Sequence, residues 1–224
     1  SLFVSGIQVT GDQEDNLVVK AYRKLQSQYN LPGIDVYLHK HIPFGAGMGG
    51  GSADAAFMLK MLKDYFGLSV SAEELEVLAG ELGADCPFFC RNKPVFATGT
   101  GNVFSPVRFS LKGYHLVIVK PAVSVSTKEA FSGITPVCPQ QSVRDIIEKL
   151  PIQDWKACLK NDFEKTVFKH HPELERIKNL LYGQGAVYAS MSGSGSALFG
   201  IFNQEINAKS LFPDCFVWEG PCEY

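Results

Sequence analysis

The sequence contains the segment Pro43-Phe44-Gly45-Ala46-Gly47-Met48-Gly49-Gly50-Gly51-Ser52-Ala53, in which five glycines fall within seven positions directly before a predicted helix. Glycine lacks a Cβ atom, so it adopts positive φ angles and lets a ligand approach the backbone. The first N–H groups of a helix have no intrahelical partners, and the helix dipole favours an anion there. The segment therefore predicts a loop that binds a phosphate group.

The overall composition is that of an ordinary globular protein. The chain has 224 residues, 46% of them hydrophobic, and a net charge of −2. This balance favours neither a nucleic-acid partner nor an anionic membrane. No apolar run approaches the roughly 18 residues of a spanning helix, and no secretory signal is visible. Six scattered cysteines without a CxxC pair predict reduced thiols, no metal site and a cytoplasmic protein.

Hydrophobic periodicity predicts the elements around the glycine-rich segment. Alternating apolar residues from Ile34 to Leu38 predict a strand before it, and helical spacing predicts a helix from Ser52 to Phe66. We expect a helix over residues 16–29 with Asp15 as its cap, and another from a capping box at Ser71 to about Leu82. Beyond these we expect strands at 94–98, 103–107, 114–120, near Tyr188 and at 197–202, and helices at 142–150, 154–170 and 173–182. This mixed order predicts α+β layers.

Several classes of glycine-rich loop can be compared with this segment. A Walker A loop requires a lysine before its final Ser or Thr, and Gly50-Gly51-Ser52 lacks one. The dinucleotide fingerprint G-x-G-x-x-G is matched by spacing, but the sequence after the next helix leaves no room for the second strand of that unit. A turn without a ligand is the remaining alternative. Each ordered glycine costs about 0.5–1 kcal/mol relative to alanine, and a turn needs only one or two.

Position by position, Pro43 to Ser52 resembles the phosphate-binding motif of the GHMP kinases, the family of galactokinase, homoserine kinase and mevalonate kinase. The resemblance implies an ATP-dependent small-molecule kinase that uses Mg²⁺. It also implies two α/β sandwiches, a ribosomal-protein-like N-terminal domain over residues 1–112 and a ferredoxin-like C-terminal domain over residues 113–224. The residues implied to bind ATP in this segment are Pro43, Gly45, Ala46, Gly47, Met48, Gly49, Gly50, Gly51, Ser52 and Ala53.

A carboxylate follows the next predicted helix in the segment Gly83-Ala84-Asp85-Cys86-Pro87-Phe88-Phe89. From the residues alone, Asp85 could bond to the backbone of a turn or carry chemistry. The segment resembles the catalytic-aspartate segment of the GHMP branch that acts on 4-diphosphocytidyl-2-C-methyl-D-erythritol. The resemblance implies that Asp85 is the general base and that the γ-phosphate of ATP moves to the 2-hydroxyl of this diphosphocytidyl sugar alcohol, in non-mevalonate isoprenoid (terpenoid) biosynthesis.

Three further segments resemble ligand-binding parts of the same family. Gly193, Ser194 and Gly195 resemble the third motif, which implies substrate contact; the alternative is a flexible turn. Thr127 and Phe131 keep the spacing at which the branch contacts substrate and stacks on cytosine; the alternatives are a helix cap and core packing. Asn16 lies in a segment that resembles the adenine site, with helix capping as its alternative.

The resemblance also implies an upstream segment of about fifty residues with a lysine in an Ala-Lys-x-Asn pattern. No such pattern precedes the glycine-rich segment, and Ser1 to Val4 is expected to lie inside the sheet of the first domain, so we expect the sequence to be part of a longer protein. A homoserine- or mevalonate-type kinase and a non-catalytic nucleotide-binding protein are the alternative functions. We expect a monomer or homodimer with no nucleic-acid or membrane partner.

Overall fold

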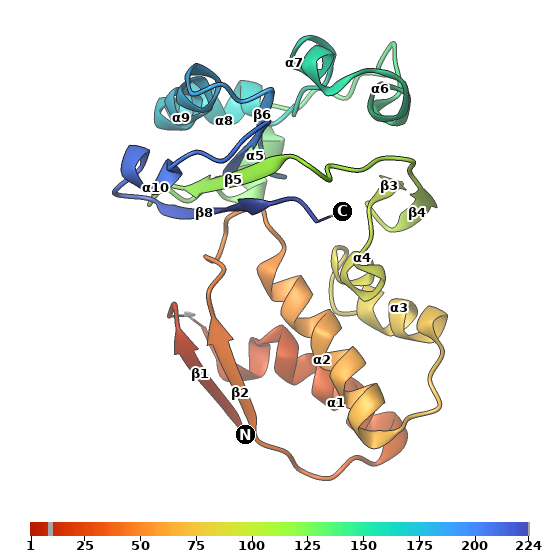
Figure 1. Ribbon diagram of the computed structural model, residues 1–224. Coiled ribbons are helices and arrows are strands. Elements are labelled where there is room, and N and C mark those ends of the chain that lie inside the picture. The colour runs from red at the N-terminus through yellow and green to blue at the C-terminus, as the bar shows by residue number, and fades with distance from the viewer. Residues whose placement is uncertain (9–10, 224) are drawn as a thin grey trace. The chain divides into compact units, whose positions relative to one another are not determined.

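A computed structural model describes residues 1–8 and 11–223, and the chain divides into two compact units (Figure 1). The first unit comprises Ser1–Phe44 and Gly49–Val107, and the second comprises Gly45–Met48 and Arg108–Tyr224. Four residues of the glycine-rich loop are therefore grouped with the C-terminal half of the chain. The domain boundary expected between residues 112 and 113 stays a prediction.

The first unit packs helices on a small parallel strand pair. Its elements are β1 (Leu2–Gly6), the 3-10 turn η1 (Gln13–Asp15), α1 (Leu17–Tyr29), β2 (Val36–Lys40), α2 (Gly50–Phe66), α3 (Ala72–Gly80), α4 (Cys86–Arg91), β3 (Val95–Thr98) and β4 (Val103–Pro106). β1 pairs with β2 in parallel, and β3 with β4 as an antiparallel hairpin. α1 and α2 lie side by side in Figure 1 and share a core that includes the fully buried Leu25, Leu59 and Leu62.

Local signals account for most of these element ends. α2 begins two residues earlier than expected and ends at Gly67, which adopts the left-handed conformation. The capping box predicted at Ser71 is confirmed, because Ser71 and Glu74 exchange hydrogen bonds. The cap predicted at Asp15 is wrong. Asp15 ends η1, and the Asn16 side chain instead accepts the Val18 N–H at 3.0 Å.

The second unit is built on a four-stranded antiparallel sheet in the order β6-β7-β5-β8. Its strands are β5 (His115–Lys120), β6 (Tyr188–Met191), β7 (Leu198–Phe202) and β8 (Phe216–Pro221). Its helical elements are α5 (Thr127–Ser132), α6 (Val143–Lys149), η2 (Ile152–Asp154), α7 (Trp155–Cys158), α8 (Glu164–His170), α9 (Pro172–Gly183) and α10 (Ala208–Leu211). β8 was not expected from the sequence, since its half-buried edge position produces no clean alternation.

Both faces of this sheet are covered, because successive side chains of a strand point to opposite faces. On β7, Leu198 and Phe202 join a cluster with residues of α8 and α9, while Ile201 joins a cluster with Trp155 of α7. The mixed helices and strands of both units confirm the expected α+β class. Within the described residues, no helix is both long and apolar enough to cross a bilayer.

The single helix expected over residues 154–170 is wrong. η2 ends at Asp154, α7 runs only from Trp155 to Cys158, and α8 begins at Glu164. Between them the Asn161 side chain accepts the Phe163 N–H at 3.0 Å and donates to the carbonyl oxygens of Met191 and Gly193. Such side-chain bonds to the backbone compete with helix formation. The break in the helix therefore brings Asn161 to the loop that follows β6.

Candidate active site

The glycine-rich loop has the backbone geometry expected for an anion site. Gly45, Gly47 and Gly49 have φ angles of 63°, 70° and 67°, and they alternate with Ala46 and Met48. An alternation of left-handed and ordinary residues turns successive N–H groups into one concavity. Gly49 supplies no side-chain cap, so the first N–H groups of α2 have no intrahelical acceptor. The loop therefore offers the donors that the phosphates of a nucleotide require.

A second loop rich in glycine and serine, residues 191–196, packs directly on Gly47 within the second unit. The Ser192 hydroxyl donates to the Gly47 carbonyl oxygen at 2.8 Å, and the Ala197 N–H donates to the Ala46 carbonyl oxygen at 3.0 Å. A Cβ atom added to Gly47 would lie 2.1 Å from the Ser192 carbonyl oxygen and 3.0 Å from Gly195 N. The structure thus joins the predicted phosphate segment to the predicted substrate segment at Gly193–Gly195.

Asp85 immediately precedes α4 and is exposed, and its side chain makes no capping hydrogen bond. The alternative that Asp85 bonds to the backbone of its turn is therefore not what the structure shows. The next residue, Cys86, is fully buried; burial raises the pKa of its thiol, and a hydrogen bond from Ser52 opposes this effect. A Cβ atom added to Gly49 would lie 2.8 Å from the Phe89 ring. These contacts of Cys86 with Ser52 and of Phe89 with Gly49 pack α4 on the first turn of α2.

A partly buried ion pair lies close to the same turn of α2. Lys40, at the end of β2, is 8% exposed and pairs with the Asp54 carboxylate. The Lys40 ammonium nitrogen would lie 3.8 Å from a Cβ atom on Gly50. The sequence reasoning did not single out this pair, because its partners lie 14 positions apart on a strand and a helix.

The predicted substrate residues of α5 are both open to solvent. Ser126 caps this helix by accepting the Glu129 N–H at 3.1 Å, so the alternative that Thr127 is the cap is wrong. Phe131 is 58% exposed and meets Phe163 edge-on at 4.8 Å. A ring this exposed is not a plain core residue. Asn16, in contrast, caps α1, and its contact with adenine stays a prediction.

Comparison with known proteins places the chain in a family. The descriptions "GHMP kinases N terminal domain" and "GHMP kinases C terminal" match residues 16–93 and 143–212. The chain is 56% identical over 218 residues to the 4-diphosphocytidyl-2-C-methyl-D-erythritol kinase of Parabacteroides distasonis, covering 96% of this chain and 80% of that protein. It is 57% identical to the Bacteroides fragilis kinase of the same name, covering 91% and 74%. The chain belongs to the GHMP kinase family.

Solved structures agree with this membership. A crystal structure of 4-(cytidine 5'-diphospho)-2C-methyl-D-erythritol kinase matches with a TM-score of 0.80 and 30% identity, covering 98% of this chain and 81% of that one. Homoserine kinase from Cytophaga hutchinsonii matches with a TM-score of 0.72 but 17% identity, covering 99% and 81%, which is a likeness of fold. As a GHMP kinase the chain is an ATP-dependent small-molecule kinase, so the expected fold, enzyme class and use of ATP are confirmed.

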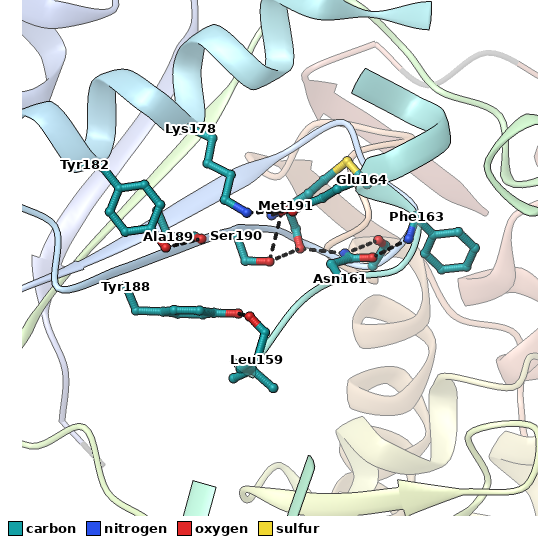
Figure 2. Close-up of polar contacts among 11 residues, drawn as sticks. Leu159, Asn161, Phe163, Glu164, Lys178, Tyr182, Tyr188, Ala189, Ser190 and Met191 are labelled. Atoms are coloured by element: carbon teal, nitrogen blue, oxygen red, sulfur yellow. Dashed lines mark hydrogen bonds and ion pairs between the residues drawn. The ribbon is translucent and has the colours of Figure 1, made fainter. Parts of the chain in front are cut away.

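Sequence reasoning missed the polar side chains that support the second loop of this GHMP kinase. Asn161, Glu164 and Lys178 gather at the end of β6 (Figure 2). The only local signal was Asn161-Asp162 inside an apparently helical stretch, since Asn and Asp favour turns over helix interiors.

Across the described ranges 1–8 and 11–223, no group of three His, Cys, Asp or Glu residues is arranged to hold a metal ion.

Proposed function

We propose that this kinase transfers the γ-phosphate of ATP to the 2-hydroxyl of 4-diphosphocytidyl-2-C-methyl-D-erythritol, a step of non-mevalonate isoprenoid biosynthesis. The observation that carries the proposal is 56–57% identity, over more than nine-tenths of the chain, to kinases named for this substrate. The homoserine and mevalonate kinases of similar fold share only 16–17% identity. A shared fold alone does not determine which substrate an enzyme accepts.

The glycine-rich loop would bind the phosphates of ATP through backbone N–H groups. Gly45 to Met48 contribute the concave stretch, Gly49 to Ala53 contribute the start of α2, and Pro43 fixes the entry to the loop. The helix dipole and these open donors favour the same negative charge. Lys40, paired with Asp54 near the first turn of α2, adds a buried cation close to this charge.

Mg²⁺ is an expected companion of the nucleotide. This cation is held largely by substrate phosphates with one or two protein oxygens. The Ser52 hydroxyl, in the first turn of α2, is an oxygen donor of the required kind, so the residues fit such an ion. When bound, Mg²⁺ would neutralise part of the triphosphate charge.

Asp85 would accept the proton of the attacking hydroxyl. Its carboxylate is exposed and makes no capping bond, so its oxygens are available to a substrate. The buried Cys86 and Pro87 that follow anchor the start of α4, which supports a fixed position for Asp85. Thr127 and the Gly193–Gly195 segment would contact the substrate, and Phe131 would stack on its cytosine ring.

The proposal is tested by measuring ADP release from the natural, full-length protein. The panel contains the diphosphocytidyl alcohol, homoserine and mevalonate, each with Mg²⁺ and ATP, and ³¹P NMR identifies the product. We expect release only with the diphosphocytidyl alcohol and a new phosphate ester at its 2-position. Preference for another alcohol would contradict the substrate, and nucleotide binding without release would favour a non-catalytic role. A cytoplasmic location, the oligomeric state and the lack of nucleic-acid or membrane partners stay predictions.

A further inference from the structure

Asn161 holds two carbonyl groups of the second glycine-serine loop. Its side-chain N–H groups donate to the carbonyl oxygens of Met191 and Gly193, each at 2.8 Å. Its side-chain oxygen accepts the Phe163 N–H at 3.0 Å, which orients the amide (Figure 2). Both donors of this amide are thus used on the loop, and neither is used within its own segment.

Glu164 holds the same end of β6 through other groups. β6 is an edge strand of the four-stranded sheet, so it has no neighbouring strand on its outer side. The Glu164 carboxylate is 9% exposed and accepts the Met191 N–H at 2.9 Å and the Ser190 hydroxyl at 3.2 Å. Lys178 pairs with it at 2.6 Å, which compensates the buried charge. Both backbone groups of Met191 are therefore held from this side.

This support determines the direction of one N–H group of the loop. In a planar trans peptide the C=O and N–H bonds point in opposite directions. Since the Gly193 carbonyl points toward Asn161, the N–H of the same peptide, which belongs to Ser194, points away from it. Within the described part of the chain, this N–H donates to no acceptor. Ser194 is partly exposed to solvent, which is compatible with a ligand as the acceptor of this N–H.

We propose that Asn161 is a positioning residue that aims the Ser194 N–H at an anionic oxygen of the bound phosphate-bearing ligands. The inference rests on the proposed function insofar as it takes the Gly193–Gly195 segment to contact substrate. It assigns no chemical step to Asn161. Asn161 acts by orienting the peptide between Gly193 and Ser194. With this orientation the Ser194 N–H donates one charge-assisted hydrogen bond to the ligand, and without it that hydrogen bond is lost.

Two variants of Asn161 remove the hydrogen bonds that its amide donates to the loop but keep the turn that its side-chain oxygen closes with the Phe163 N–H. Asn161→Asp and Asn161→Ser each retain an oxygen that can accept the Phe163 N–H, but neither can donate to the Met191 and Gly193 carbonyl groups as the amide does. We expect kcat/KM for the diphosphocytidyl alcohol to fall about tenfold to a hundredfold, the effect of losing one hydrogen bond to a charged group. The serine variant should stay folded, with a modest decrease of its thermal midpoint from the two lost hydrogen bonds.

The matched control is Asn207→Asp, which makes the same chemical change at a cap that accepts the Ser210 N–H and does not touch the loop. It should leave all constants unchanged. A second readout is the Ser194 amide resonance in a ¹H–¹⁵N spectrum, recorded with ATP and then with the diphosphocytidyl alcohol. We expect one of these ligands to shift it in the unmodified protein and neither to shift it in Asn161→Asp.

The outcomes separate this inference from the proposed function. If both Asn161 variants keep the kcat/KM of the unmodified protein, and the ligand still shifts their Ser194 amide resonance as it does in the unmodified protein, the positioning role is overturned and the proposed substrate stays intact. A protein without activity on the diphosphocytidyl alcohol would overturn the proposed substrate, while the amide titration with ATP would still decide the role of Asn161. If the aspartate variant does not fold, the serine variant carries both measurements.

Discussion

The Ser192 hydroxyl donates a 2.8 Å hydrogen bond to the carbonyl oxygen of Gly47, a residue 145 positions earlier in the chain. The bond joins the two glycine-rich loops of this kinase within one compact unit. The approach is so close that a side chain at Gly47 has no room. The geometry of the phosphate loop therefore depends on a segment near the other end of the sequence.

Gly47→Ala should disable the enzyme and lower its stability. The new Cβ would lie 2.1 Å from a backbone oxygen that cannot rotate away, so the two loops must separate. We expect kcat/KM to fall about a hundredfold or more, comparable to losing oriented backbone donors. Steady-state kinetics and thermal unfolding measure the two effects.

Gly45→Ala is the control for the strain of a positive φ angle. Gly45 has φ 63°, but nothing lies within 4 Å of its added Cβ. Gly45→Ala should lower the free energy of unfolding by about 1–2 kcal/mol, the cost of the left-handed backbone alone. Gly47→Ala should lower it by a further ~1–3 kcal/mol, because its Cβ also overpacks the loop. Equal unfolding free energies for the two variants would contradict the importance of the Ser192 contact.

Asp85→Asn should lower kcat about 10²–10⁴-fold, the usual contribution of a general base. Because Asp85 makes no capping bond, neither the fold nor the dissociation constant for ATP should change measurably. Asp64→Asn, at an exposed position near the end of α2, makes the same chemical change and should leave kcat unaltered. Turnover of Asp85→Asn at the unmodified rate would remove this residue from the base role.

Phe131→Ala separates stacking on substrate from packing within the protein. The ring is 58% exposed, so its removal should change the thermal midpoint little. Loss of one base–aromatic stack, worth about 1–3 kcal/mol, should raise KM for the diphosphocytidyl alcohol roughly 5- to 150-fold. Phe57→Ala, at an exposed position of α2, is the control and should leave KM unchanged. A large loss of stability without a change in KM would show that Phe131 is structural.

Tyr188 should make stability depend on pH in alkaline solution. Burial raises the pKa of Tyr188 to about 12, above its ordinary value of 10.0. The neutral Tyr188 phenol contributes fully to the free energy of unfolding below pH 10. This contribution is lost as the pH rises toward 12, because the unfolded chain loses the phenolic proton first. The free energy of unfolding therefore falls by roughly 2–3 kcal/mol over this pH range through Tyr188 alone.

Denaturant unfolding of Tyr188→Phe measures this effect. The variant loses the hydrogen bond to the Leu159 carbonyl oxygen, about 0.5–1.5 kcal/mol at neutral pH, and should show a weaker decline of stability between pH 10 and 12. Tyr65→Phe, at a ring that is 80% exposed, should retain the decline of the unmodified protein. An identical pH profile for all three proteins would contradict the assignment to Tyr188.

Local signals predicted the elements that short-range forces determine. The helix after the glycine-rich segment, the capping box at Ser71 and the strand before Pro121 follow from spacing and side-chain caps. The errors fell where distant groups compete for the same residue. Asn161 interrupts a helical pattern because its amide bonds to carbonyl groups thirty and thirty-two positions away, which no local window contains.

The amino-acid sequence by itself determined that a run of glycines leads into a helix and that a carboxylate, Asp85, follows the next predicted helix. The short helix α4 that begins after Asp85 was seen only in the structure. Glycine permits positive φ whatever surrounds it, so the motif could be recognised, and phosphate binding predicted, without a fold. Only the tertiary structure decided which side chains hold the second loop against Gly47 and in which direction the Ser194 N–H points. These properties depend on contacts between segments far apart in the chain, and chain packing alone brings them within hydrogen-bond distance.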